Sequence, residues 1–173
     1  MAKIPSLKNL SKVTPKSFEK IVFRNVRQGY NPLEDRGSLQ RGGRWNIQKR
    51  YGALYSSIER KTCIRELERE AKRRGLDIKD LQPRQIVSLK VKIKKVLDLT
   101  DTRILSLLGI SEDDLKLDDC TLPQEISDAA RKLGYEAILS PSATGKGKNL
   151  NIYLDMMHED SLLEVVEKDI LKM

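Results

Sequence analysis

The stretch QIVSLKVKIKKVLDL, residues 85–99, decides the fold class. Apolar and charged side chains alternate along it, and an extended strand sends successive side chains to opposite faces. The alternation therefore predicts a strand with one buried face and one face in water. Expected inside are Ile86, Leu89, Val91 and Ile93, and expected outside are Lys90, Lys92 and Lys94.

The chain after this strand reads as short helices followed by short strands. Thr100 or Asp101 is expected to cap a short helix that ends near Gly109. Ser111 is expected to cap an acidic turn that follows it. A second helix is expected at 122–133, stopped by Gly134. Three short apolar segments separated by turn-forming residues then predict strands at 137–139, 150–154 and 163–166.

The chain before the long strand combines two short strands with a long polar segment. Residues 21–23 predict a strand that ends at Arg24, and 53–55 begin another. Between them, 27–48 is rich in Gly, Asn, Pro and charge, and it is longer than an ordinary connection, which favours a functional loop. Ser57 is expected to cap a helix that runs to about residue 73.

Composition and length favour one globular domain. The 173 residues are 39% hydrophobic and 34% charged, without repeats or a linker. We therefore expect a single α+β domain of short mixed and antiparallel strands with flanking helices. Residues 1–19 are expected to form an N-terminal extension, and 20–173 the domain itself.

Several classes of protein are disfavoured by what the sequence lacks. No segment has the apolar core of a signal peptide or the roughly 20 apolar residues of a membrane span, so a cytoplasmic protein is expected. Cys63, Cys120 and the single His158 are too few and too scattered for a metal site or for catalysis by a Ser-His-Asp or Cys-His arrangement. The net charge of +8 fits nucleic acid, an acidic protein or a phosphate-bearing small molecule equally well.

Three short segments stand out as candidates for chemistry. In RGGRWN, residues 41–46, paired glycines are followed by a cation, a large ring and an amide. Tyr55 stands at a strand end, and Glu66 lies on the following helix beside the apolar stripe. The segment 140–149, SPSATGKGKN, is loop-like but lacks the order of a Walker A phosphate loop. Each segment alone is also compatible with an ordinary turn or surface position.

Taken together, these segments resemble the RES-domain family, named for its Arg, Glu and Ser. The resemblance extends over about residues 20–167 and includes both order and spacing. Weaker support comes from 96–101, Pro123-Gln124 and Gly134-Tyr135. Its specific parts are Phe23-Arg24, Gly42-Gly43-Arg44-Trp45-Asn46, Tyr55, Glu66, Pro141-Ser142-Ala143 and Asn149.

The resemblance implies a fold similar to ADP-ribosyltransferases and a toxin that degrades NAD, inhibited by a cognate Xre-like antitoxin protein. It implies that Arg24 and Arg44 hold the pyrophosphate or ribose, that Tyr55 packs on the nicotinamide, and that Glu66 and Ser142 serve the reacting ribose. Ser140 competes with Ser142, which we prefer because it occupies the Pro-Ser-Ala pattern. The implied catalytic residues are Glu66, Arg44 and Ser142, and the implied NAD-binding residues are Arg24, Arg44, Trp45, Tyr55, Ser142 and Asn149.

The first hypothesis is therefore cleavage of NAD at the nicotinamide–ribose bond, without a metal and with NAD as substrate. The acceptor stays open between inorganic phosphate, water and a protein side chain. ADP-ribosylation of a specific protein is the second hypothesis, since the same residues would serve it. A nucleic-acid-binding module is the third, favoured by the charge of +8 and by the lysines at 90–95, but the chain lacks the interleaved surface aromatics that stack on bases.

Overall fold

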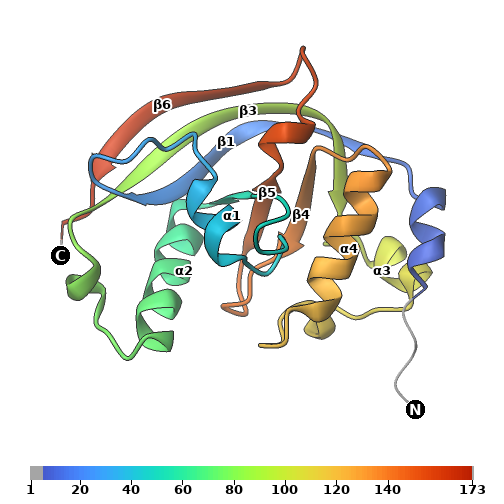
Figure 1. Ribbon diagram of the computed structural model, residues 1–173, viewed down its shortest axis with the longest axis horizontal. Helices are drawn as coiled ribbons and strands as arrows, with labels where there is room; N and C mark the ends of the chain where they lie inside the picture. The colour runs from blue at the N-terminus through green and yellow to red at the C-terminus, as the bar shows by residue number, and fades with distance from the viewer. Residues whose placement is uncertain (1–5, 173) are drawn as a thin grey trace.

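The computed structural model describes residues 6–172. Within that range the strands form one mixed sheet in the order β1-β2-β5-β4-β3-β6 (Figure 1). A further pairing between β1 and β3 closes five strands into a barrel-like ring, with β6 alongside β3. The strands are β1 (Lys16–Arg27), β2 (Leu54–Ser57), β3 (Arg84–Asp98), β4 (Ala137–Pro141), β5 (Lys148–Ile152) and β6 (Leu162–Ile170).

Helices flank this ring on two sides. In Figure 1 α1 and α2 lie on one side of the central β4 and β5, α3 and α4 lie on the other, and the long β1, β3 and β6 run across the top. The pairing of β3 with β4 is parallel, and the other pairings are antiparallel. The α-helices are α1 (Arg36–Arg41), α2 (Arg60–Arg73), α3 (Thr102–Leu108) and α4 (Thr121–Lys132). Short 3-10 turns are at Leu7–Lys12, Ile78–Leu81, Asp113–Leu115 and Leu154–Met156.

Alternation along the strands divides the core between two faces. On β3, Val96 packs in one hydrophobic cluster and Leu97 in another, and Ala137 and Ile138 of β4 divide in the same way. One cluster is built by the strands of the ring, and the other joins the sheet to α3 and α4. A third cluster holds α2 against Ile86 of β3. The site described below lies where α2 meets the ring.

The long alternating strand predicted at 85–99 is confirmed as β3, with its expected apolar residues buried and its lysines exposed. The predicted helices before Gly109 and Gly134 are confirmed as α3 and α4. Asp101, one of two expected caps, accepts a hydrogen bond from the backbone N–H of Arg103 at 2.9 Å. The strands expected after residue 136 are confirmed as β4, β5 and β6, each with slightly different bounds.

The chain before β3 differs more from the prediction. The first strand begins at Lys16 and ends at Arg27, because pairing with β3 extends it well beyond its short apolar centre. The expected loop at 27–48 contains α1. Residues 1–5 lie outside the described range, but of the expected extension Leu10 and Val13 are buried in the core that contains α3 and α4.

The expected role of Ser57 as a helix cap is wrong. Ser57 is the last residue of β2, and Glu59 stands at the N-cap of α2. Because Ser57 pairs with Asn149 across the sheet, its hydroxyl is used in the site instead of at the helix end.

Acidic partners accompany the lysines on the outer face of β3. Lys90 lies across from Glu164 on β6, and Lys92 across from Glu19 on β1. Lys94 forms an ion pair with Asp160. The positive charge of this face is therefore locally balanced, which weakens the nucleic-acid hypothesis.

No helix within residues 6–172 combines the length and apolar character needed to cross a bilayer. The longest, α2, has 14 residues, against the roughly 20 that a span requires.

Candidate active site

The centre of the candidate site is the carboxylate of Glu66 on α2. Cys63, Leu67 and Ala71 bury one face of this helix, and Glu66 lies beside that face, half-buried. The hydroxyl of Ser142 donates to Glu66 Oε1 at 2.6 Å, and the amide of Asn149 donates to the same oxygen at 2.7 Å. Three residues far apart in sequence thus meet at one carboxylate oxygen.

The hairpin between β4 and β5 brings Ser142 to Glu66. The backbone N–H of Ser142 donates to the carbonyl of Gly147 at 2.9 Å, which closes the loop. Gly147 has a φ of +84°, and a Cβ there would stand 2.2 Å from Oγ1 of Thr62. A glycine is therefore required for the hairpin to approach the first turn of α2 so closely.

Asn149 is oriented by a second bond from β2. Ser57 is paired with Asn149 across the sheet, and its hydroxyl donates to Asn149 Oδ1 at 2.8 Å. The oxygen of the amide is thereby engaged, and its NH₂ group faces Glu66. Sequence reasoning missed Ser57 as a member of the site, because a serine just before a helix is typical of a cap.

The structure separates the two candidate serines. Ser142 contacts Glu66 and also exchanges a hydrogen bond with the hydroxyl of Thr144 at 2.7 Å. Ser140 accepts a hydrogen bond from the amide of Asn151 at 3.0 Å within the sheet. Both serines are fully buried. Only the position of Ser142, one residue beyond the end of β4, lets its hydroxyl reach α2.

Tyr55 and the Gly43–Asn46 turn form one hydrogen-bonded unit. The Tyr55 hydroxyl donates to Asn46 Oδ1 at 2.7 Å and accepts from the backbone N–H of Trp45 at 2.9 Å. Burial raises the pKa of Tyr55 well above its ordinary value, so the phenol stays protonated. The Trp45 ring is 2% exposed and packs in the core, so its polar contribution here is made by its backbone.

The Gly43–Asn46 turn depends on a close approach to Tyr55. A Cβ on Gly43 would stand 2.3 Å from the Tyr55 hydroxyl oxygen. The backbone of Gly43 and Asn46 pairs reciprocally, and the Asn46 amide donates to the carbonyls of Ser38 and Tyr51, each at 2.9 Å. Gly43 and Asn46, two candidate residues from the sequence, therefore stabilise the turn.

Arg24 reaches the same region from β1. Its Nη1 donates to the carbonyl of Tyr55 at 3.2 Å and its Nη2 to the carbonyl of Glu34 at 3.0 Å. Its Nε is buried, and none of residues 6–172 forms a hydrogen bond with it. Burial lowers the pKa of Arg24 to about 10, and the group is still a cation at neutral pH. A desolvated cation with an unused donor is suited to an anionic ligand.

Arg44 faces the segment before α4. Its Nη1 donates to the carbonyl of Leu115 at 3.1 Å and to that of Leu117. Within residues 6–172 no hydrogen bond joins Arg44 directly to Glu66, Ser142 or Asn149. The structure therefore unites Glu66, Ser142 and Asn149 in one cluster, and it holds Arg24 and Arg44 around Tyr55 and its turn.

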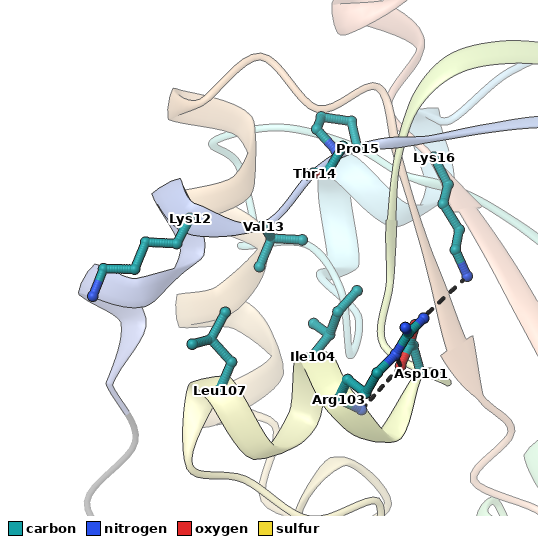
Figure 2. Close-up of a pocket in the computed structure, with 9 residues that line it drawn as sticks. All are labelled: Lys12, Val13, Thr14, Pro15, Lys16, Asp101, Arg103, Ile104 and Leu107. Atoms are coloured by element: carbon teal, nitrogen blue, oxygen red, sulfur yellow. Dashed lines mark hydrogen bonds and ion pairs between the residues drawn. The ribbon is translucent and has the colours of Figure 1, made fainter.

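A separate cavity of about 430 Å³ lies between the start of β1 and α3, and none of the expected site residues lines it (Figure 2). Three of its charged groups pair with one another, since Asp101 lies 3.8 Å from Lys16 and 3.0 Å from Arg103. Over the described part of the chain, no group of His, Cys, Asp and Glu could hold a metal ion.

Comparison with known proteins gives one family. The model of the RES domain matches residues 21–172. The NAD(+) phosphorylase MbcT of Mycobacterium tuberculosis strain H37Rv is 28% identical over 123 residues, which are 70% of this chain and 66% of MbcT. The probable NAD(+) phosphorylase Rv3189 of the same strain is 36% identical over 105 residues, 61% of this chain and 50% of that protein. The matched part therefore covers about two thirds of MbcT and half of Rv3189.

A solved structure shares the fold. The crystal structure of the M. tuberculosis MbcT-MbcA toxin-antitoxin complex aligns with a TM-score of 0.87 at 22% sequence identity. The alignment covers 95% of this chain and 91% of the other. The mixed single domain with a strand barrel and flanking helices is therefore an arrangement already known in another protein.

Proposed function

Because the chain belongs to the RES domain family, we propose that it is the toxin of a toxin–antitoxin pair and cleaves the nicotinamide–ribose bond of NAD. The observation that carries this proposal is the Glu66 carboxylate, held by Ser142 at 2.6 Å and by Asn149 at 2.7 Å. A carboxylate fixed by neighbouring donors is suited to a sugar that becomes cation-like as its bond breaks.

Glu66 supplies the electrostatic part of the reaction. Both hydrogen bonds from Ser142 and Asn149 end on Oε1, and we assign Oε2 to a ribose hydroxyl. The negative charge stabilises the positive charge that develops on the ribose ring. Nicotinamide leaves as a neutral molecule from a cationic pyridinium, so the step needs no general acid. This agrees with a site built without a histidine.

The remaining residues bind and orient NAD. Arg24 and Arg44 are assigned to its phosphates and ribose, because guanidinium groups match phosphate oxygens in pairs. Tyr55 is assigned to the nicotinamide, with its hydroxyl fixed by Asn46 and by the backbone of Trp45. Trp45, buried in the core, sets the position of Tyr55 through that bond. NAD acts here as substrate and not as a resident cofactor.

Phosphate is the proposed acceptor, which makes the reaction a phosphorolysis. Two relatives are named NAD(+) phosphorylase or probable NAD(+) phosphorylase, which supports this choice over water or a protein side chain. The bond from ribose C1 to nicotinamide nitrogen breaks, and a bond from the same carbon to a phosphate oxygen forms. The products are nicotinamide and phosphorylated ADP-ribose.

The proposal includes the finer points of fold and partner that the sequence suggested. A likeness to ADP-ribosyltransferases fits a glutamate that acts on NAD. The aligned MbcT belongs to a toxin-antitoxin complex, which supports an antitoxin as the partner of this chain. The family match begins at residue 21, which supports a catalytic domain over 20–173, although Leu10 and Val13 of the preceding segment pack into its core.

The decisive experiment measures NAD consumption by the purified full chain, with and without phosphate, and identifies the products. We expect phosphate-dependent release of nicotinamide. Glu66→Gln keeps the size of the side chain but removes its charge, so turnover should fall about a hundredfold or more. NAD affinity should change little, because binding is assigned mainly to Arg24 and Arg44.

Glu68→Gln is the matched control, because Glu68 is exposed on the same helix two residues away. It should keep the activity of the unchanged protein. Thermal unfolding of both variants shows whether they are folded. Full activity in a folded Glu66→Gln protein would overturn the proposed mechanism, and absence of NAD cleavage by the unchanged chain would overturn the proposed function.

A further inference from the structure

Two arginines from different elements converge on one short segment before α4. Arg44, from the turn that holds Tyr55, donates to the carbonyls of Leu115 and Leu117. Arg69, from α2, contacts the carboxylate of Asp118 at 3.2 Å. Leu117 and Asp118 are consecutive, so the two guanidinium groups bond to neighbouring residues of one segment.

Arg69 is placed to serve the same site as Glu66. It follows Glu66 by three residues on α2, and residues at this spacing lie on the same side of a helix. Its side chain is 24% exposed, whereas those of Arg60, in the first turn of the helix, and Arg74, at its C-cap, are 44% and 43% exposed. Arg69 is thus turned inward toward the segment before α4, which in Figure 1 reaches toward α2 at the lower edge of the molecule.

A phosphate group can compete with the protein groups that contact these two cations. The side chain of Asp118 is 90% exposed, so its ion pair with Arg69 is screened by solvent and contributes little. Arg44 donates its hydrogen bonds to backbone carbonyls, which carry no net charge. A phosphate group would offer both arginines a full negative charge and several acceptor oxygens, and such charge-assisted bonds are the stronger ones.

We propose that Arg44 and Arg69 form an anion subsite for a phosphate group, which the Leu117 carbonyl and the Asp118 carboxylate occupy in the free protein. Binding of the phosphate group replaces the Leu117 carbonyl and the Asp118 carboxylate, and it releases the segment Lys116–Cys120 from Arg69 of α2. The Leu115 carbonyl stays bonded to Arg44. The identification of a phosphate group as the ligand rests on the proposed function. Its source is either the pyrophosphate of NAD or the inorganic phosphate acceptor.

The first test measures binding of inorganic pyrophosphate to the full chain by calorimetry, without NAD and at constant ionic strength. Arg69→Gln should weaken binding about tenfold or more, because it removes one of two charged donors. Arg74→Gln removes an equal charge at the C-cap of the same helix, from an exposed position paired with Glu70, and this variant should bind pyrophosphate as the unchanged protein does.

The second variant acts in the opposite direction. Asp118→Asn removes the internal competitor from an exposed position, where little effect on folding is expected, and should tighten pyrophosphate binding about threefold or more. Glu159→Gln makes the same change in net charge at an exposed position on the connection before β6, so it controls for general electrostatics. Affinity of Arg69→Gln equal to the unchanged protein, or of Asp118→Asn equal to Glu159→Gln, would overturn the proposal.

Kinetics then distinguish the two sources of phosphate. A raised KM for phosphate in Arg69→Gln, with the KM for NAD unchanged, identifies the acceptor site, and the reverse identifies the NAD pyrophosphate. No change in either KM would overturn the subsite. Because pyrophosphate binding needs no turnover, its dependence on Arg69 and Asp118 is decided even if the chain fails to cleave NAD. Failure of the subsite and failure of the proposed function are therefore separate results.

Discussion

At the scale of single residues, Ser140 and Ser142 differ in role although both are fully buried. The hydroxyl of Ser142 is bonded to Glu66, whereas that of Ser140 accepts from the Asn151 amide inside the sheet. We therefore expect Ser142→Ala to lower NAD turnover tenfold or more, by analogy with the loss of one oriented catalytic contact, and to cost about 1 to 3 kcal/mol of folding free energy, because its buried hydroxyl bonds to a carboxylate. Ser140→Ala should instead cost about 1 kcal/mol of folding free energy and leave turnover nearly unchanged. Urea unfolding and NAD consumption, measured on the same preparations, check both variants. Loss of turnover in Ser140→Ala but not in Ser142→Ala would assign the active serine to Ser140.

At the scale of elements, the site depends on how closely the β4–β5 hairpin approaches α2. Gly147→Ala would place a methyl group 2.2 Å from Oγ1 of Thr62, so the hairpin must move and Ser142 must withdraw from Glu66. Gly145 has a similar φ of +88°, against +84° at Gly147, but has nothing within 4 Å of its Cβ position. Both substitutions should cost about 1 kcal/mol of backbone strain, but only Gly147→Ala should lower turnover by tenfold or more. Thermal unfolding with NAD consumption tests this, and equal activity of the two variants would contradict it.

At the scale of the whole molecule, the buried Glu136 joins three parts of the chain through its carboxylate. It accepts from the backbone N–H groups of Lys95 at 3.0 Å and His158 at 2.8 Å, and from the hydroxyl of Ser161. Burial by itself raises the pKa of Glu136, but these hydrogen bonds outweigh it and hold the pKa below its ordinary value. The ionised Glu136 carboxylate therefore makes its full contribution to the free energy of unfolding above the unfolded-state pKa of about 4.3. This contribution is lost as the pH falls through the lower folded-state pKa.

Glu136→Gln should accordingly lower the free energy of unfolding by about 2 kcal/mol at neutral pH, since an amide cannot accept all of these bonds. The difference between the two proteins should narrow below about pH 4, where the carboxylate of the unchanged protein becomes protonated. Urea unfolding across pH measures this. A difference that stays constant down to pH 3 would show that the charge of Glu136 contributes nothing.

Patterns within single segments determined much of the fold. The alternation at 85–99 determined β3, because one face of that strand is apolar along most of its length. Caps and glycines determined α3 and α4, since each signal lies within a few residues of the helix end that it specifies. The candidate residues Glu66, Ser142 and Asn149 were also named before the structure, from the resemblance of their segments to the RES-domain family.

Only the tertiary structure decided how these segments meet. Closure of the ring by β1 and β3, the bond from Ser57 to Asn149, the choice of Ser142 over Ser140, and the convergence of Arg44 and Arg69 all join residues that are distant in sequence. A local pattern specifies which face of a strand or helix is apolar, but not which partner covers that face. The partner is fixed by packing and hydrogen bonding between elements, and these exist only once the chain has folded.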